Sequence, residues 1–153
     1  DHWVNNSGWL EESSHHCDWF GITCNGEGFT TEMDLTDNNL TGTLEMKNEE
    51  IAKFYCEHWA SFDCDVGFVT LPIQLESLLL AMNGISGTFG GAKFFDYRML
   101  TRIDISENNF SGAIDILASP AIVYINASYN NFTSVMRYKQ FNPSFESLQV
   151  VDL

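Results

Sequence analysis

The sequence predicts an α/β solenoid, in which a short strand and a turn recur along the chain and stack coil on coil. Three observations predict it: apolar residues recur at fixed spacing, an asparagine stands at one phase of each copy, and most copies follow one another at the length of a single coil. The clearest copy has apolar residues at Leu100, Ile103, Ile105, Phe110 and Ile114, with Asn108 between the strand and the turn. One copy alone leaves half of its apolar surface wet, so neighbouring copies are expected to share a continuous core.

The polar and glycine positions of this copy have separate physical roles. Asn108 is expected to turn inward, where its amide can satisfy backbone groups that a tight coil removes from water. Gly112 allows a bend where a side chain would obstruct the chain. The whole pattern, L-x-x-L-x-L-x-x-N-x-L-x-G-x-I, is the signature of a leucine-rich repeat.

Other stretches match the same template. They are Thr31–Leu44, Leu75–Phe89, Ile122–Met136, in which Ser134 replaces the glycine, and Leu148–Leu153, which opens a fifth copy. The asparagines of the four fuller copies, Asn38, Asn83, Asn108 and Asn130, are separated by 45, 25 and 22 positions. Repeats of this kind run roughly 20–29 residues, so the first interval must hold an insertion or a decayed repeat.

The composition is that of a folded, acidic domain. Of 153 residues, 44% are hydrophobic, and the 12 Phe, 4 Trp and 5 Tyr argue against disorder. The formal net charge is −14, from 21 acidic and 7 basic residues. This charge argues against nucleic acid and anionic membranes as partners, because phosphate-binding surfaces need clustered Lys and Arg. No apolar run approaches the ~20 residues of a membrane span, so we expect no membrane insertion by this segment.

The cysteines form two close pairs, Cys17 with Cys24 and Cys56 with Cys64. Local pairs in a chain with other marks of secretion predict two disulfides that close short loops. Metal binding is the alternative, because His15 and His16 precede Cys17 and His58 lies within the second pair. Zinc sites usually show C-x2–4-C spacing, which neither pair has, so we expect two disulfides and no metal site.

The acceptor motif for N-linked glycans, N-x-S/T, occurs at Asn5, Asn39, Asn109, Asn126 and Asn131. Three of these asparagines immediately follow the inward asparagine of their repeat. At that phase a side chain should point outward from the turn, where a glycan would not disturb the core. With the paired cysteines, this pattern predicts a secreted or cell-surface glycoprotein.

Residues 1–28 are predicted to cap the open end of the first coil. They carry the pattern W…W-L…C-x-W-x-G-[VI]-x-C, at Trp3, Trp9, Leu10, Cys17, Trp19, Gly21, Ile22 and Cys24. Together with the repeats, this pattern resembles plant-type extracellular leucine-rich repeat proteins with an N-terminal, cysteine-paired cap. The resemblance implies a right-handed solenoid with a short parallel sheet on its concave side. We expect a helical cap in which Trp9, Trp19 and Phe20 act as lids.

The solenoid is predicted to occupy residues 29–153, with about four repeats, the start of a fifth, and an insertion at 45–74. Apolar residues of the insertion recur at helical spacing, at Ile51, Phe54, Tyr55, His58, Trp59 and Phe62. They predict a helix from about Asn48 to Ser61, held by the Cys56–Cys64 disulfide. Its apolar face either packs on the convex side of the solenoid, as most such faces do, or is presented to a partner.

Residues between the inward positions of the strands should form columns on the concave surface. The columns are Glu32, Ser77, Arg102, Tyr124 and Val150; Asp34, Leu79, Asp104, Asn126 and Asp152; Thr36, Ala81, Ser106 and Ser128; and Asp37, Met82, Glu107 and Tyr129. The surface is acidic, with a small apolar and aromatic patch, and Tyr and Met are common at binding surfaces. The candidate binding face comprises Leu79, Met82, Arg102, Asp104, Tyr124 and Tyr129. Exposed residues of this kind need no ligand, however, and a glycan on Asn126 would obstruct a large partner.

The sequence is compatible with two functions, recognition of a ligand and a structural role. No G-x-S-x-G, H-E-x-x-H or phosphate-loop motif is present, so we expect neither catalysis nor a cofactor. The resemblance implies recognition of a protein or glycan ligand, or adhesion. The alternative is a structural subunit of an extracellular glycoprotein fibril or wall. The sequence stops within its fifth repeat without a polar closing cap, so either the natural protein continues beyond Leu153 or another copy, stacked head to tail, covers the open end.

Overall fold

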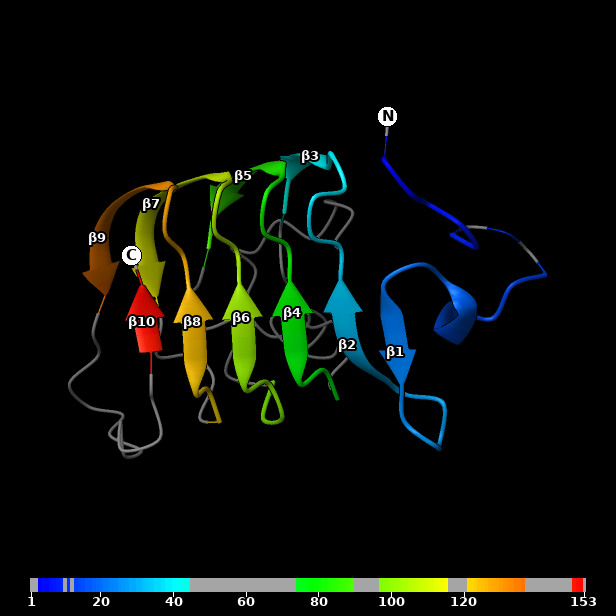
Figure 1. Ribbon diagram of the computed structural model, residues 1–153. Coiled ribbons are helices and arrows are strands. Elements are labelled where there is room, and N and C mark those ends of the chain that lie inside the picture. Colours follow the sequence, from blue (N-terminus) through cyan, green and yellow to red (C-terminus); the bar gives the residue numbers. More distant parts are fainter. Residues whose placement is uncertain are drawn as a thin grey trace, which may run out of the picture.

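The computed structural model describes residues 3–9, 11, 13–44, 74–89, 97–115, 121–136 and 150–152. The predicted insertion helix and the Cys56–Cys64 pair lie outside these residues, as do Leu10 of the cap and Leu153. Successive coils stand side by side, and the strands of two sheets line the solenoid (Figure 1).

The repeat strands form a six-stranded sheet in the order β1-β2-β4-β6-β8-β10. Its strands are β1 (Ile22–Cys24), β2 (Thr30–Asp34), β4 (Ser77–Leu79), β6 (Arg102–Asp104), β8 (Tyr124–Asn126) and β10 (Val150–Asp152). From β2 to β10 every neighbouring pair is parallel, whereas β1 runs antiparallel to β2. Parallel neighbours need a connection that leaves the sheet and returns, which is what one coil supplies. The predicted parallel sheet is confirmed, with β1 of the cap added at its edge.

The core lies behind this sheet and follows the predicted repeat positions. Met33, Leu78, Ile103 and Ile125 are opposite one another in register, and the last three are at most 3% exposed. Deeper in the core, the Phe110 ring meets Phe89 and Phe132, with ring centroids 5.4 and 6.3 Å apart. Each coil therefore buries its apolar residues against the next coil.

A second, four-stranded parallel sheet follows the inward asparagines, and the sequence analysis does not predict it. Its order is β3 (Thr41–Thr43), β5 (Gly84–Thr88), β7 (Asn109–Asp115) and β9 (Asn131–Met136). Gly87 has a φ of 112°, and a Cβ there would lie 2.8 Å from Thr43 Cγ2. The repeat glycine therefore permits close approach of neighbouring coils. Where Ser134 replaces it, the β7–β9 register shifts between Gly112 and Ala113.

The expected helical cap is not supported. In its described part the helical element is the three-residue 3-10 helix η1 (His16–Asp18). The helix ends at Trp19, whose backbone is extended (φ −74°, ψ 144°). Gly21 then has a φ of 78°, and a Cβ there would overlap the Asp34 carbonyl oxygen. Instead the chain enters β1, and the Asp34 amide donates to the Gly21 carbonyl at 2.7 Å.

Aromatic packing and one asparagine join the cap to the first coil. Trp9 lies against Trp3 and Trp19, with centroids 5.1 and 4.8 Å apart, and packs on the core as the lid prediction expects; Phe20 is 38% exposed. Asn38 accepts the Asn5 amide at 2.7 Å and donates to the Asn5 carbonyl at 2.9 Å. The backbone of the cap thus bonds Asn38 much as a preceding coil would.

Candidate binding face

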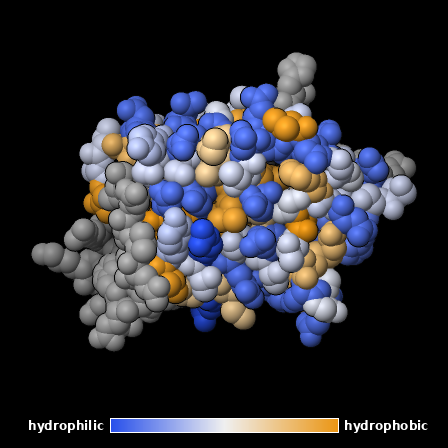
Figure 2. Space-filling model, viewed as in Figure 1, coloured by the Kyte–Doolittle hydropathy of each residue, from blue (hydrophilic) through white to orange (hydrophobic). Residues whose placement is uncertain are grey.

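The register of the six-stranded sheet brings the predicted columns together. Glu32 is opposite Ser77, Ser77 opposite Arg102, and Arg102 opposite Tyr124. Because side chains alternate across a strand, this column lies on the side away from Leu78 and Ile103, which we call the outer face. In Figure 2, viewed as in Figure 1, the described surface is mainly hydrophilic, with scattered hydrophobic residues.

The turns after the strands carry the fourth column, Asp37, Met82, Glu107 and Tyr129, which we call the turn column. All four residues have positive φ values, of 50°, 57°, 52° and 55°. Their backbones continue the ladder between coils, since the Asp37, Met82 and Glu107 amides donate to carbonyls of the following coil. Met82 is 48% exposed and Tyr129 is 82% exposed. The column therefore presents two large apolar side chains and two carboxylates at the margin of the outer face.

The inward asparagines hold these turns in place. Asn108 Oδ1 accepts the Ile85 amide at 3.0 Å, and its Nδ2 donates to the carbonyls of Leu80, Ile105 and Ser106 at 2.8–3.2 Å. Asn83 and Asn130 make the corresponding bonds one coil away on either side. The predicted role of these asparagines is confirmed, and the turn column is fixed by the repeat rather than by its own side chains.

We call the second column, Asp34, Leu79, Asp104, Asn126 and Asp152, the central column. Its acidic and amide groups have a local structural role that the sequence analysis missed. Asp104 Oδ1 accepts the Ser106 amide and hydroxyl at 3.1 and 2.7 Å. Asn126 Oδ1 bonds Ser128 in the same way at 3.2 and 2.8 Å, and its Nδ2 donates to Asp104 Oδ2 at 3.3 Å. The signal in the sequence was an Asp or Asn followed two residues later by Ser or Thr, a motif typical of turns. Asp104 is thus largely occupied within the fold.

Arg102 and Tyr124 form the remaining part of the candidate face. The Arg102 guanidinium carbon lies 4.3 Å from the centre of the Tyr124 ring, a distance at which the cation and the ring attract each other. Arg102 stays exposed while Tyr124 and Leu79 are half-buried. The six predicted face residues therefore divide into exposed groups (Met82, Arg102, Tyr129) and groups engaged or partly covered (Leu79, Asp104, Tyr124).

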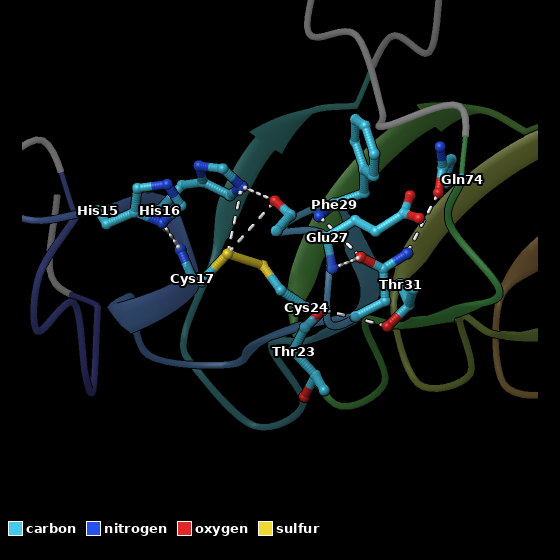
Figure 3. The surroundings of a disulfide bond; sticks show 11 residues. His15, His16, Cys17, Thr23, Cys24, Glu27, Phe29, Thr31 and Gln74 are labelled. Carbon is cyan, nitrogen blue, oxygen red and sulfur yellow. Dashed lines mark hydrogen bonds between the residues drawn. A yellow bond between two sulfur atoms is a disulfide. The ribbon is translucent and has the colours of Figure 1, made fainter.

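The first cysteine pair is a disulfide, as predicted. Cys17 and Cys24 are joined with a Cα–Cα distance of 5.6 Å, and the bond ties η1 to β1 (Figure 3). His16 Nε2 lies 3.1 Å from the Gly28 carbonyl oxygen and 3.4 Å from Cys17 Sγ. His15, His16 and Cys17 have ligand atoms within 4.8 Å of one another, but the Cys17 sulfur is already bonded to Cys24. The group therefore lacks the thiolate that a metal would bind.

The acceptor asparagines fall into two groups. Asn39, Asn109 and Asn131 are exposed, on or beside the first residues of the four-stranded sheet. Asn5 and Asn126 are half-buried, and Asn5 Oδ1 accepts the Ser7 amide and hydroxyl at 3.0 and 2.7 Å. Only the first group stands clear of the outer face and of the cap.

No model of a known protein family matches the chain. It is 27% identical over 126 residues to MDIS1-interacting receptor like kinase 1 of Arabidopsis thaliana, covering 81% of this chain and 10% of that protein. It is 28% identical over 150 residues to Serine/threonine-protein kinase BRI1-like 1 of Arabidopsis thaliana, covering 95% of this chain and 11% of that protein. The chain thus spans about a tenth of the length of these relatives.

The crystal structure of PEPR1–AtPEP1 shares the fold, with a TM-score of 0.54 and 20% identity over 87% of this chain and 17% of that one. These findings confirm the resemblance to plant-type extracellular leucine-rich repeat proteins. Among the described residues, no helix has the length and apolar character needed to cross a membrane.

Proposed function

We propose that this chain is a recognition segment of an extracellular leucine-rich repeat protein, and that it binds a protein partner through the outer face without catalysing a reaction. The similarity to receptor kinases supports an extracellular recognition role. It extends over about a tenth of their length, so kinase activity is not carried over to this chain.

The observation that carries the proposal is the exposure of Met82 and Tyr129 in the turn column. A left-handed backbone costs an ordinary L-residue roughly 1–2 kcal/mol, and glycine or asparagine would occupy the position more easily. A side chain that packs in the core could offset this cost, but Met82 and Tyr129 are 48% and 82% exposed. Side chains of this size at an unfavourable, exposed position are explained by contact with a partner, for which Tyr and Met are well suited.

The alternatives have less support. A glycan ligand or an adhesive role would use the same face, but no described residue distinguishes it. In a head-to-tail fibril, the end of one copy would dock on the first coil of the next. The Asn38 side chain of that coil is already hydrogen-bonded to the Asn5 backbone of the cap. The cap, rather than an open coil, would therefore be the docking surface.

The test is a binding screen of the secreted, purified chain against plant receptor ectodomains and secreted peptides, by biolayer interferometry. The face variant is Met82→Ala/Tyr129→Ala. The matched control is Met99→Ala/Phe29→Ala, which also removes one exposed methionine and one exposed aromatic ring (57% and 47% exposed) but leaves the turn column intact. We expect a binder whose affinity falls about tenfold or more with the face variant, as for residues central to an interface, and is unchanged by the control. Equal binding by both variants, or no binder in the screen, would contradict the proposal.

A further inference from the structure

The disulfide of the cap lies beside two histidines, and the four side chains together are the ligand types of a zinc site. His15, His16 and Cys17 are consecutive, and their ligand atoms lie within 4.8 Å of one another. Cys24 is the disulfide partner of Cys17, so its sulfur belongs to the same group. Two thiolates and two imidazoles are a set that zinc binds with tetrahedral coordination. The oxidised cap offers no thiolate, so this ligand set forms only when the disulfide is reduced.

His16 already lies where such a site needs a nitrogen ligand. Its Nε2 atom is 3.4 Å from Cys17 Sγ (Figure 3). In a tetrahedral zinc site, bonds of about 2.1 Å to nitrogen and about 2.3 Å to sulfur set these two atoms about 3.6 Å apart. The same Nε2 lies 3.1 Å from the Gly28 carbonyl oxygen, and this hydrogen bond would be exchanged for the bond to the metal. Little movement of His16 is therefore needed.

His15 supplies the second imidazole. Its ring lies against the His16 ring, with centroids 4.3 Å apart, and its Nδ1 accepts the Cys17 amide at 3.3 Å. An amide that donates to Nδ1 requires a lone pair on that nitrogen, which is also the state in which the nitrogen binds a metal. Because His15 is exposed, its ring can turn from this long hydrogen bond toward the two sulfurs.

Other contacts hold the cap in place when the disulfide is open. β1 stays paired with β2, with Cys24 opposite Thr30, and the Asp34 amide donates to the Gly21 carbonyl at 2.7 Å. The cysteines are only 7 positions apart in the sequence, and closing so short a loop stabilises a fold less than closing a long one. Cys17 and Cys24 are both half-buried, so a metal ion can reach their sulfurs from solvent.

We propose that the cap is a redox-dependent zinc site, closed by a disulfide when oxidised and by zinc on His15, His16, Cys17 and Cys24 when reduced. A dithiol reductant gives two electrons and two protons to the disulfide and becomes a disulfide itself, which leaves two thiols in the cap. Zinc then displaces the two thiol protons into water as the thiolates bind it. One cross-link between η1 and β1 is thereby replaced by another. The site lies in the cap and does not depend on the proposed binding face.

The probe is Co²⁺, followed by Zn²⁺, titrated into the intact secreted chain after reduction with dithiothreitol and removal of the reductant by gel filtration under argon. Co²⁺ takes the place of the colourless Zn²⁺ and reports thiolate ligands by a charge-transfer absorption band. The site variant is His15→Gln/His16→Gln, in which glutamine keeps an amide that can donate to the Gly28 carbonyl. The matched control is His2→Gln/His58→Gln, which removes the other two histidines of the sequence.

A second matched pair tests the sulfur ligands. Cys17→Ser/Cys24→Ser removes the proposed thiolates, whereas Cys56→Ser/Cys64→Ser removes the other two cysteines of the sequence. Cys24→Ser alone frees the Cys17 thiol without any reductant and leaves three of the four ligands.

We expect reduction to produce a charge-transfer band that saturates with one Co²⁺ per cap and disappears when Zn²⁺ is added. The affinity should fall about a hundredfold or more in the His15/His16 variant, because the binding free energy of a structural zinc site is shared among its four ligands. It should be unchanged in the His2/His58 control. The band should be lost in the Cys17/Cys24 variant and kept in the Cys56/Cys64 variant. The Cys24→Ser variant should bind Co²⁺ without reductant, more weakly than the reduced parent chain.

Full affinity in the His15/His16 variant would show that thiols alone bind the metal, and would overturn the proposal. A band that persists in the Cys17/Cys24 variant, or a stoichiometry of one metal per two chains, would overturn it as well. Tryptophan fluorescence of each oxidised variant checks that the cap is folded. If a histidine variant does not fold, the Cys24→Ser variant still decides the question, because a folded Cys24→Ser chain that binds no Co²⁺ would contradict the site.

Discussion

At the scale of single residues, the inward asparagines connect backbone chemistry to the position of the binding face. Each amide replaces hydrogen bonds that the tight turn cannot make within its own coil. Because these bonds reach the neighbouring coil, they also fix where the turn column stands. Loss of such a buried side chain costs more than the hydrogen bonds it makes, since it leaves several backbone groups unpaired in the interior.

Replacement of Asn108 by alanine should therefore be costly. Asn108 is 6% exposed, and its loss leaves the Ile85 amide and three carbonyls without this partner. We expect the free energy of unfolding to fall by about 3 kcal/mol. The measurement is urea unfolding of enzymatically deglycosylated protein, followed by tryptophan fluorescence.

The neighbouring Asn109→Ala variant is the control. Asn109 is exposed and points away from the core, so its replacement should change the unfolding free energy by less than about 0.5 kcal/mol. If the two variants lost equal stability, the turns would not depend on the hydrogen bonds of the inward asparagines.

At the scale of secondary-structure elements, the two sheets differ in what holds neighbouring coils together. The six-stranded sheet places large residues such as Leu78 and Ile103 toward the core. The four-stranded sheet brings β3 and β5 close enough that a glycine is required at position 87. The strands of this sheet follow the inward asparagines, so a change in the distance between these strands would also displace the turn column.

Gly87→Ala should weaken this second sheet. Alanine at a φ of 112° is strained, and its Cβ would meet Thr43 Cγ2. We expect a loss of about 2 kcal/mol in unfolding free energy and faster hydrogen exchange in β3 and β5 than in β8. Gly26→Ala serves as the comparison, because nothing lies within 4 Å of a Cβ there. A Gly87→Ala variant as stable as Gly26→Ala would show that the coils can separate at this point without cost.

How well each of these elements could be predicted depends on the pattern that it leaves in the sequence. The core positions and the outer columns were predictable, because a strand alternates its side chains and the asparagine fixes the phase. The second sheet was not predicted, although Ile85, Gly87 and Phe89 alternate as a strand would. The glycine at its centre was interpreted as a bend, whereas the structure uses it for close approach.

The cap and the details of the face were less predictable. The aromatic lids and the Cys17–Cys24 disulfide could be inferred from their motif. The extended backbone at Trp19, which ends η1 after three residues, leaves no such pattern in the sequence. The stacking of Arg102 on Tyr124 depends on side-chain orientation, which register alone does not determine. The four columns could be listed in advance, but the division of the six candidate face residues into engaged and exposed groups required the structure.

At the scale of the whole molecule, the solenoid separates two surfaces with different uses. The outer face of the six-stranded sheet carries the proposed site, and the turns that lead into the four-stranded sheet carry exposed acceptor asparagines. Asn126 is the exception, because it lies in the central column of the outer face between Asp104 and the Asp152 position. A glycan there would cover the surface that the proposed function requires.

We therefore expect the secreted protein to carry glycans at Asn39, Asn109 and Asn131 and to leave Asn126 unmodified. In the folded chain, Asn126 Nδ2 donates to Asp104 and its Oδ1 accepts from Ser128, so this asparagine already has a structural use. The measurement is enzymatic deglycosylation in 18O-labelled water followed by peptide mass spectrometry, which marks each occupied asparagine. Asn126→Gln is the companion variant: if the site is empty, partner binding should change little, whereas an increase in binding would show that a glycan had blocked the face. Full occupancy of Asn126 in protein that still binds its partner would move the binding surface away from the outer face, and with it the roles assigned to Met82 and Tyr129.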